Sequence, residues 1–279
     1  MSALLTMLAG DGPILPRVMI VVAHPDDETI GLGAQLCRLR DVLLLHLTDG
    51  APRDGADVRR AGFADPADYA AARRRELTAA LAAGDAAGMR IASFGVPDRE
   101  AFCDLSGLSR RLVARIAQER PTAVLTHAYE GGHPDHDAAA FAVHAACRLV
   151  RSSAAPRERE ARPEQAVPPP AIIEMPFYHA GNGGMEFGRF LPADSKEIVL
   201  RLDAAARRRK RFMRDRFATQ RDVLAGFPLD AERFRAAPAH DFRRPPHDGP
   251  LLYEAWGWGI TGDDWRRRAT ATLVGFGLD

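Results

Sequence analysis

Two clusters of histidine and acidic residues contain the chemistry of this sequence, and both include the tripeptide His-Pro-Asp. The first is "AHPDDE", which begins at Ala23, and the second is "HPDHD", which begins at His133. Imidazole and carboxylate groups bind Zn²⁺, Fe²⁺ and other first-row metal ions. A catalytic zinc commonly takes three protein ligands and lowers the pKa of a water molecule in its open position. A remaining carboxylate can then act as a general base, and a remaining histidine as a general acid.

A less specific interpretation is available for each residue alone. A single Asp or His after a strand is usually a capping or turn residue, and Asp26 and Asp137 could do no more than that. Two clusters with the same His-Pro-Asp core are harder to explain by capping, because capping needs one side chain and not a set. We therefore expect a metal site.

The clusters follow apolar runs, and helical patterns follow the clusters. The run 18–23 is continuous and rich in valine and isoleucine, as is typical of a strand buried on both faces. Alternation of strands and helices predicts an α/β fold, a Rossmann-like, mostly parallel sheet with helices on both faces. Ligands of such sheets bind beyond the carboxyl ends of the strands. The expected strands are 18–23, 42–50, 89–98, 122–132, 171–180 and 197–203, and the expected helices are 29–40, 68–88, 106–121, 137–150 and a basic helix after Asp203.

Composition limits the classes of protein that need to be considered. The 38 Lys and Arg residues nearly balance the 37 Asp and Glu residues, so we expect neither nucleic-acid binding nor attraction to an anionic membrane. The three cysteines form no Cys-x-x-Cys pair, which argues against a disulfide framework and favours a cytoplasmic protein. Neither a signal peptide nor a membrane span is expected. We expect one domain over residues 1–279, with a mobile loop at 151–170 that is rich in proline and charge.

Together the two clusters carry a family resemblance. "AHPDDE" with a later "HPDH" resembles the LmbE-like or PIG-L family of zinc-dependent de-N-acetylases, which remove acyl groups from amino sugars such as N-acetylglucosamine and from their conjugates. The segment 226–279 is expected to diverge from the family. Further similar stretches are "TDG" at 48–50, "RRRELTAAL" at 73–81, "RFATQ" at 216–220 and "YEAW" at 253–256.

The resemblance implies a metal-dependent hydrolase with an α/β fold that acts on a small N-acyl amino sugar or glycoconjugate. His24, Asp27 and His136 would hold one Zn²⁺ per chain, although Fe²⁺ or another divalent ion suits the same ligands. Asp26 would be the general base that takes a proton from water.

The resemblance also implies an acid. His133 would be protonated and would deliver a proton to the departing amine, while Asp135 would hold the His133 ring and keep its pKa high. Some relatives have a tyrosine where this sequence has Gly131. Residues expected at the substrate are Arg73, Asp98, Tyr129, His127 and His179, the last three as substitutes for that tyrosine.

Other features have simpler interpretations. His46 and His144 are expected in or near the core, and His240 and His247 at the surface. Glu28 is expected to support a metal ligand. Three tryptophans near the C-terminus, Trp256, Trp258 and Trp265, could stack on a sugar face, but packing that anchors the C-terminal segment is the more common role. The basic run 207–222 is expected to be a solvated helix face, with an arginine that reaches an anionic substrate as the less favoured alternative.

Two other classes of protein remain open at this point. A non-catalytic sugar-binding relative would keep the fold, but it would have no need for an acid and a base. A non-haem Fe(II) oxygenase could use His24, Asp26 and a distant histidine, but such enzymes usually have an all-β barrel. The specific substrate, the acyl chain and the oligomeric state are not determined by the sequence.

Overall fold

A seven-stranded sheet forms the centre of the molecule in this computed structural model, which describes residues 3–154, 169–181 and 183–278. The strand order is β3-β2-β1-β4-β5-β9-β8, in which the first five strands run parallel and β9 is antiparallel to both of its neighbours. The predicted α/β, mostly parallel sheet is confirmed. The strands are β1 Val18–Val22, β2 Val42–Pro52, β3 Arg90–Asp98, β4 Ala123–His127, β5 Ala171–Met175, β8 Glu197–Arg201 and β9 Ala231–Ala236, and β6 Tyr178–Gly181 pairs with β7 Gly184–Phe187 in a separate ribbon.

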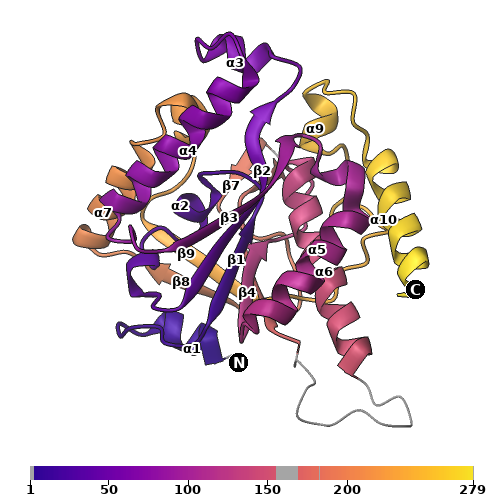
Figure 1. Cartoon of the computed structure of the whole chain (residues 1–279), viewed down its shortest axis with the longest axis horizontal. Coiled ribbons are helices and arrows are strands. Elements are labelled where there is room, and N and C mark those ends of the chain that lie inside the picture. The colour runs from indigo at the N-terminus through magenta and orange to yellow at the C-terminus, as the bar shows by residue number, and fades with distance from the viewer. Residues whose placement is uncertain (1–2, 155–168, 182, 279) are drawn as a thin grey trace.

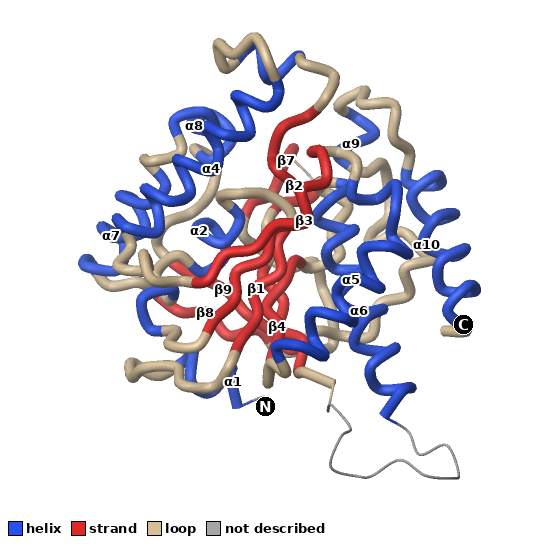
Figure 2. The backbone as a smooth tube through the Cα atoms, viewed as in Figure 1, coloured by secondary structure: helices blue, strands red, loops and turns tan. Residues whose placement is uncertain are grey.

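Helices cover both faces of the sheet (Figures 1 and 2). Side chains along β1 alternate between the two cores, since Ile20 packs with one apolar cluster and Met19 and Val21 pack with the other. This alternation explains why a strand buried on both faces is apolar at every position. The first cluster includes residues of α1 Ala3–Ala9, α2 Asp27–Leu32, α4 Pro66–Ala83 and α7 Ala204–Arg214, and the second those of α5 Leu105–Glu119, α6 Pro134–Ala154 and α10 Gly262–Phe276. Shorter helices are α3 Ala56–Arg60, α8 Arg221–Leu224 and α9 Leu252–Ala255, with 3-10 turns at Leu36–Arg38, Ala101–Asp104 and Ala218–Gln220.

The sheet register brings the two clusters together. Val18 of β1 pairs with Val42 of β2 on one side and with Ala123 of β4 on the other. Because all three strands run parallel from aligned starts, β1 and β4 end at the same edge. The residues that follow β1 therefore meet the residues that follow β4.

Several predicted elements differ from the observed ones. The strand predicted over 171–180 is broken at Pro176, which lacks the amide hydrogen needed to continue the ladder. The helix predicted over 29–40 ends at Leu32, and the chain then turns. The helix predicted over 106–121 runs from Leu105 to Glu119, and its N-cap Asp104 accepts a hydrogen bond from the amide of Gly107. Of the predicted loop 151–170, residues 155–168 lie outside the described part of the chain, and α6 continues to Ala154.

The C-terminal third contains elements that sequence patterns did not indicate. Strand β9 pairs antiparallel with β5 and β8, and α10 packs its buried Trp265 against α6. Among the described residues, none of the helices has the length and apolar character that a bilayer crossing requires.

Candidate active site

The two His-Pro-Asp clusters line one cavity. The first follows β1 and leads into the short helix α2, and the second stands at the start of α6, after β4. The cavity has a volume of about 1200 Å³. The clusters contribute to its lining His24, Asp26, Asp27, His133 and His136.

Three side chains converge in the geometry of a metal site. The His136 Nε2 atom lies 3.2 Å from Nδ1 of His24. One carboxylate oxygen of Asp27 lies 3.4 Å from that His24 atom, and the other lies 3.4 Å from Nε2 of His136. In a tetrahedral site with bonds near 2.1 Å, two ligand atoms are about 3.4 Å apart. Each of the two nitrogens thus lies nearest a different oxygen of Asp27, at separations close to those between ligands of one first-row metal ion.

Neighbouring groups hold these three side chains. The other ring nitrogen of His24, Nε2, lies 3.0 Å from Oδ1 of Asp98. A carboxylate in that position fixes the ring and its tautomer, as is usual for histidines that bind metals. The amide of His24 donates to Asp27 at 2.7 Å, and the His127 ring stacks on that of His136 at a centroid distance of 4.1 Å.

The electrostatics of the cluster favour a cation. Burial alone would raise the pKa of Asp27, but His136 and His127 hold the pKa of that carboxyl well below its usual range. Burial likewise opposes the charged form of Asp98, and His24 and His133 outweigh it and lower the Asp98 pKa. Both carboxylates are therefore ionised at neutral pH.

Asp26 has a different environment from Asp27, although the two are adjacent in sequence. Its backbone takes a φ of 148°, a conformation that non-glycine residues rarely adopt. Its Oδ2 atom accepts a hydrogen bond from Nη2 of Arg73 at 2.9 Å. Burial raises the pKa of Asp26 to about 8, with the Arg73 guanidinium opposing that rise. A carboxylate with a raised pKa is a stronger base than an ordinary aspartate.

Glu28 supports the unusual backbone of Asp26. The Oε2 atom of Glu28 accepts the amide of Asp26 at 3.1 Å, and the same oxygen lies 3.1 Å from Nε2 of His46. The hydroxyl of Thr29 donates to the other oxygen at 2.7 Å. Glu28 is fully buried. It thus holds the backbone of Asp26, whereas the sequence suggested support for a metal ligand, and His46 lies in the core as predicted.

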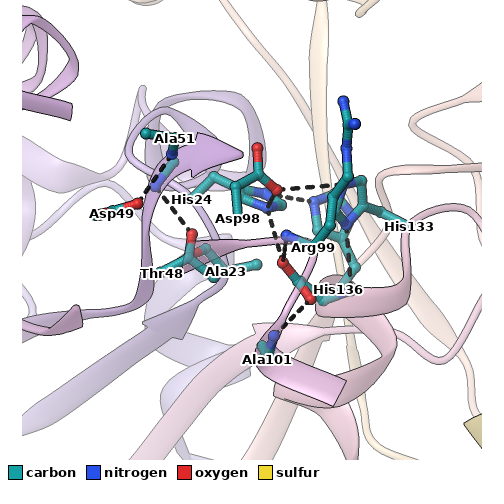
Figure 3. Close-up of polar contacts among 12 residues, drawn as sticks. Ala23, His24, Thr48, Asp49, Ala51, Asp98, Arg99, Ala101, His133 and His136 are labelled. Atoms are coloured by element: carbon teal, nitrogen blue, oxygen red, sulfur yellow. Dashed lines mark hydrogen bonds and ion pairs between the residues drawn. The ribbon is translucent and has the colours of Figure 1, made fainter. Parts of the chain in front are cut away.

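His133 is oriented through its backbone surroundings. Its Nδ1 atom accepts the amide of Asp135 at 3.1 Å. The neutral ring therefore carries its proton on Nε2, which lies 3.6 Å from Oδ1 of Asp98. Protonation of Nδ1 would break the hydrogen bond from the Asp135 amide, because both nitrogens of a charged ring are donors. Figure 3 shows Asp98 between His24 and His133.

The expected pairing of the Asp135 carboxylate with His133 is replaced by other contacts. Asp135 accepts the amides of Arg99 at 2.6 Å and Ala101 at 3.0 Å, so its carboxylate fixes the turn after β3. Burial, with a further contribution from His24, lowers the pKa of His133 well below its usual range. The carboxylate that can stabilise a charged His133 ring is that of Asp98.

The other side chains expected at the substrate are distributed between the cavity and its surroundings. Arg73 and Asp98 line the cavity, with Arg73 also donating to the carbonyls of Gly50 and Pro25. His127 is fully buried, and its Nε2 accepts the amide of Ala23.

The remaining two expected substitutes for a tyrosine occupy packed positions. The Tyr129 hydroxyl donates to the carbonyl of Arg244, and the ring stacks on buried Trp265. His179 is buried on β6, where Nδ1 contacts the carbonyl of Ala180.

Gly131 stands where a side chain would have no space. Its φ is 70°, and an added Cβ would lie 2.6 Å from Cδ2 of Leu251 and 3.1 Å from Cγ of Pro246. The segment near the C-terminus thus fills the space beside Gly131. A tyrosine in this position is incompatible with this packing.

Two tryptophans that the sequence assigned to packing line the cavity. Trp258 contacts His133 edge to face at 5.1 Å, and the guanidinium of Arg99 lies 4.1 Å from its ring centre. Trp256 is 36% exposed and packs 4.7 Å from Trp258. The spacing of glycines around these residues marks a loop, but nothing in the sequence indicates that it folds over the site.

The fold and the site define a class: an α/β protein with a His/Asp cluster and a buried aspartate, Asp26, at the carboxyl edge of a parallel sheet. Residues 19–147 match the family described as PIG-L: GlcNAc-PI de-N-acetylase. The resemblance to the PIG-L (LmbE-like) family that the sequence showed is thus confirmed over this segment.

Individual proteins are similar to parts of the chain. A 1D-myo-inositol 2-acetamido-2-deoxy-alpha-D-glucopyranoside deacetylase of Mycolicibacterium gilvum is 37% identical over 143 residues, which are 43% of this chain and 50% of that protein. The chain spans about half the length of the curated relatives it matches.

Solved structures with low sequence identity share the fold. The zinc-inhibited form of teicoplanin deacetylase aligns with a TM-score of 0.56 at 17% identity, over 78% of this chain and 97% of that one. The 4-carboxy-2-hydroxymuconate hydratase of Pseudomonas putida aligns with a TM-score of 0.52 at 17% identity, over 81% of this chain and 98% of that one. Because this fold also occurs in a hydratase, the function has to be argued from the site.

Proposed function

We propose that the protein is a metal-dependent hydrolase that removes an acyl group, most simply acetyl, from the amide nitrogen of an amino sugar or amino-sugar conjugate. The observation that carries this proposal is that Asp26 and His133 line the same cavity as the three clustered ligands His24, Asp27 and His136. A binding protein would need no such pair of proton-transfer groups.

His24, Asp27 and His136 would hold the metal. A bound Zn²⁺, or another divalent ion such as Fe²⁺, would lower the pKa of a water molecule and polarise the amide carbonyl. Asp26 would accept a proton from the attacking water, because burial makes it a stronger base than an ordinary aspartate. Arg73 holds its Oδ2 atom, which leaves Oδ1 for this proton.

His133 would supply the proton for the departing amine from Nε2, the atom that faces Asp98. The same imidazolium would stabilise the negative charge that develops on the carbonyl oxygen. Asp26 must be ionised and His133 protonated at one pH. A bell-shaped dependence of kcat/KM on pH is therefore expected.

The cavity suits a conjugate larger than a single sugar. Its volume of about 1200 Å³ exceeds the usual range of small-molecule pockets, which extends to roughly 1000 Å³. The Trp256 ring offers an apolar face to a sugar, and Arg60 and Arg221 line other parts of the wall. The relatives named as deacetylases of an acetamido sugar linked to inositol support this class of substrate.

The test combines metal content with amine release. The purified protein would be loaded with Zn²⁺ or Fe²⁺, and N-acetylated amino sugars and their conjugates would be screened for release of a primary amine and acetate. Asp26→Asn should keep its metal and lose activity by about 100-fold or more. Asp85→Asn, at an exposed aspartate outside the cavity, is the matched control and should behave like the wild type.

Three results would contradict the proposal. If metal-loaded wild type releases no amine from any conjugate, the reaction is wrong. If it consumes a substrate by adding water without amine release, a hydratase is indicated. If Asp26→Asn loses its metal, the division of labour between Asp26 and Asp27 is wrong.

A further inference from the structure

A second group of potential metal ligands lies outside the candidate active site. We refer to His144, Glu174 and His240 as the distal cluster. His144 lies on α6, Glu174 on β5, and His240 in the segment after β9. We propose that the distal cluster is a second binding site for a divalent first-row metal ion of the Zn²⁺ type, and that this ion ties the three segments together.

The donor atoms of the distal cluster converge on one carboxylate oxygen. The Oε1 atom of Glu174 lies 3.6 Å from Nε2 of His144 and 2.5 Å from Nε2 of His240. One ligand atom from each of the three residues lies within 4.8 Å of the others. The separation between His144 and Glu174 is close to the distance of about 3.4 Å between two ligand atoms of a tetrahedral zinc site. The separation between His240 and Glu174 would have to increase by about 0.9 Å to reach that distance.

His144 provides an independent observation in favour of a ligand. Its Nε2 atom is buried and makes no hydrogen bond to any residue that the structure describes. A buried polar atom without a hydrogen-bond partner is destabilising. When the ring proton is on Nδ1, the Nε2 atom offers a lone pair that a metal ion can accept.

Glu174 is held so that one oxygen faces the histidines. It is fully buried, and its Oε2 atom accepts a hydrogen bond from Nε of Arg235 at 2.9 Å. Oε1 is therefore directed at His144 and His240. The histidine side chains are 13% and 12% exposed, so an ion can enter from solvent. The sequence predicted a surface position for His240, and its packing beside Phe242 instead buries most of the ring.

The competing interpretation is an ion-pair network without metal, in which a charged His240 and Arg235 share Glu174. That network satisfies Glu174 and His240, but it leaves Nε2 of His144 without a hydrogen bond. Metal binding satisfies all three donors at once. The arrangement of two histidines and a glutamate is a known ligand set for zinc.

The distal cluster is separate from the candidate active site. His136 and His144 both lie on α6, and their separation of eight positions corresponds to about 12 Å along a helix axis. One ion therefore cannot use both sets of ligands. A metal in the distal cluster would join α6 to the segment after β9, which leads to the tryptophans of the active-site wall.

The test is a metal count on the full chain. Wild type and variants would be dialysed against micromolar Zn²⁺, and bound zinc would be measured by mass spectrometry. We expect two ions per chain in the wild type, and one in both His240→Ala and His24→Ala. Loss of both sites in the double variant is expected. His247→Ala changes another histidine of the C-terminal segment and should keep two ions.

Two further measurements separate a lost site from a damaged fold. His240→Gln is the milder substitution and should also bind one ion, with an unchanged far-UV circular dichroism spectrum. Zn²⁺ should raise the Tm of His24→Ala but not that of the double variant. A single ion in the wild type that disappears in His24→Ala would overturn the proposal, as would two ions retained in both His240 variants. Neither result depends on whether the protein is a deacetylase.

Discussion

Removal of the charge at Arg73 should move the acid limb of the pH–rate profile to higher pH. Arg73 is 3% exposed, and its Nη2 atom donates to Oδ2 of Asp26 at 2.9 Å. The guanidinium favours the ionised form of Asp26 and so lowers its pKa. In Arg73→Gln that effect is lost, the pKa of Asp26 rises, and the base is protonated over a wider range of pH.

The size of the shift follows from the geometry of the pair. Two unit charges with centres about 4 Å apart interact by roughly 4 kcal/mol at an effective dielectric constant of 20, which corresponds to about 3 pKa units as an upper limit. Pairs of this kind usually shift a carboxyl pKa by about 1–3 units. Where Asp26 is largely protonated, kcat/KM should therefore fall about 10- to 1000-fold. A bound metal lowers the Asp26 pKa in both proteins, so the difference between them remains.

The assay is kcat/KM for amine release from pH 5 to 10, with wild type and variants loaded with the same metal. Arg73→Lys keeps the charge but loses the planar hydrogen-bonding geometry, and should shift the acid limb much less than Arg73→Gln. Arg74→Gln is the control at the exposed neighbouring arginine. If Arg73→Gln folds, binds metal and shows an unmoved acid limb, then Asp26 is not the base or Arg73 does not set its pKa. Equal shifts in the Lys and Gln variants would show that hydrogen-bonding geometry matters and charge does not.

Two predictions concern the loop before α6. Asp137 is fully buried, its Oδ1 accepts the amides of Glu130 and Gly131, and burial raises its pKa to about 7. The protonated Asp137 carboxyl stabilises the fold fully when the pH is below the pKa that this group has in the unfolded chain. The stabilisation is lost as the pH rises through the pKa of the folded protein, and the free energy of unfolding falls by roughly 4 kcal/mol in total. In the metal-free protein, urea unfolding at pH 5 and pH 8 should show a smaller loss of stability in Asp137→Asn than in wild type, and equal losses would refute the assignment. Gly131→Ala should lower the free energy of unfolding by about 1–3 kcal/mol, because the added Cβ would lie 2.6 Å from Leu251 Cδ2 and the residue has a positive φ. An unchanged urea midpoint would show that the segment around Leu251 moves aside without loss of stability.

The sequence predicted the parallel half of the sheet well, because local patterns determine it. Strands β1 to β4 are short apolar runs with helices between them, and burial on both faces leaves a continuous apolar signal. In the antiparallel extension, β8 was expected at 197–203, but β9 was missed for the opposite reason. Strand β9 has the sequence "AERFRA", whose charged residues hide a strand that pairs with β5 through long-range contacts.

Within the site, the sequence indicated which residues meet but not how they touch. His24 and His136 are 112 positions apart, and only the register of β1 against β4 brings their nitrogens to 3.2 Å. The family resemblance implied that Asp135 holds the His133 ring. In the structure Asp98, from β3, lies nearest Nε2 of His133, and the Asp135 carboxylate binds backbone amides instead.

The sequence alone thus determined the α/β class, the family resemblance and the two His-Pro-Asp clusters, because these are properties of short segments. The tertiary structure decided which carboxylate faces which ring, why Gly131 has no room for a side chain, and that two tryptophans near the C-terminus form part of the cavity wall. Hydrogen-bond direction and side-chain packing depend on segments far apart in the chain, and local patterns carry no record of them. For the same reason, the meeting of His144, Glu174 and His240 became visible only once α6, β5 and the segment after β9 were placed in space.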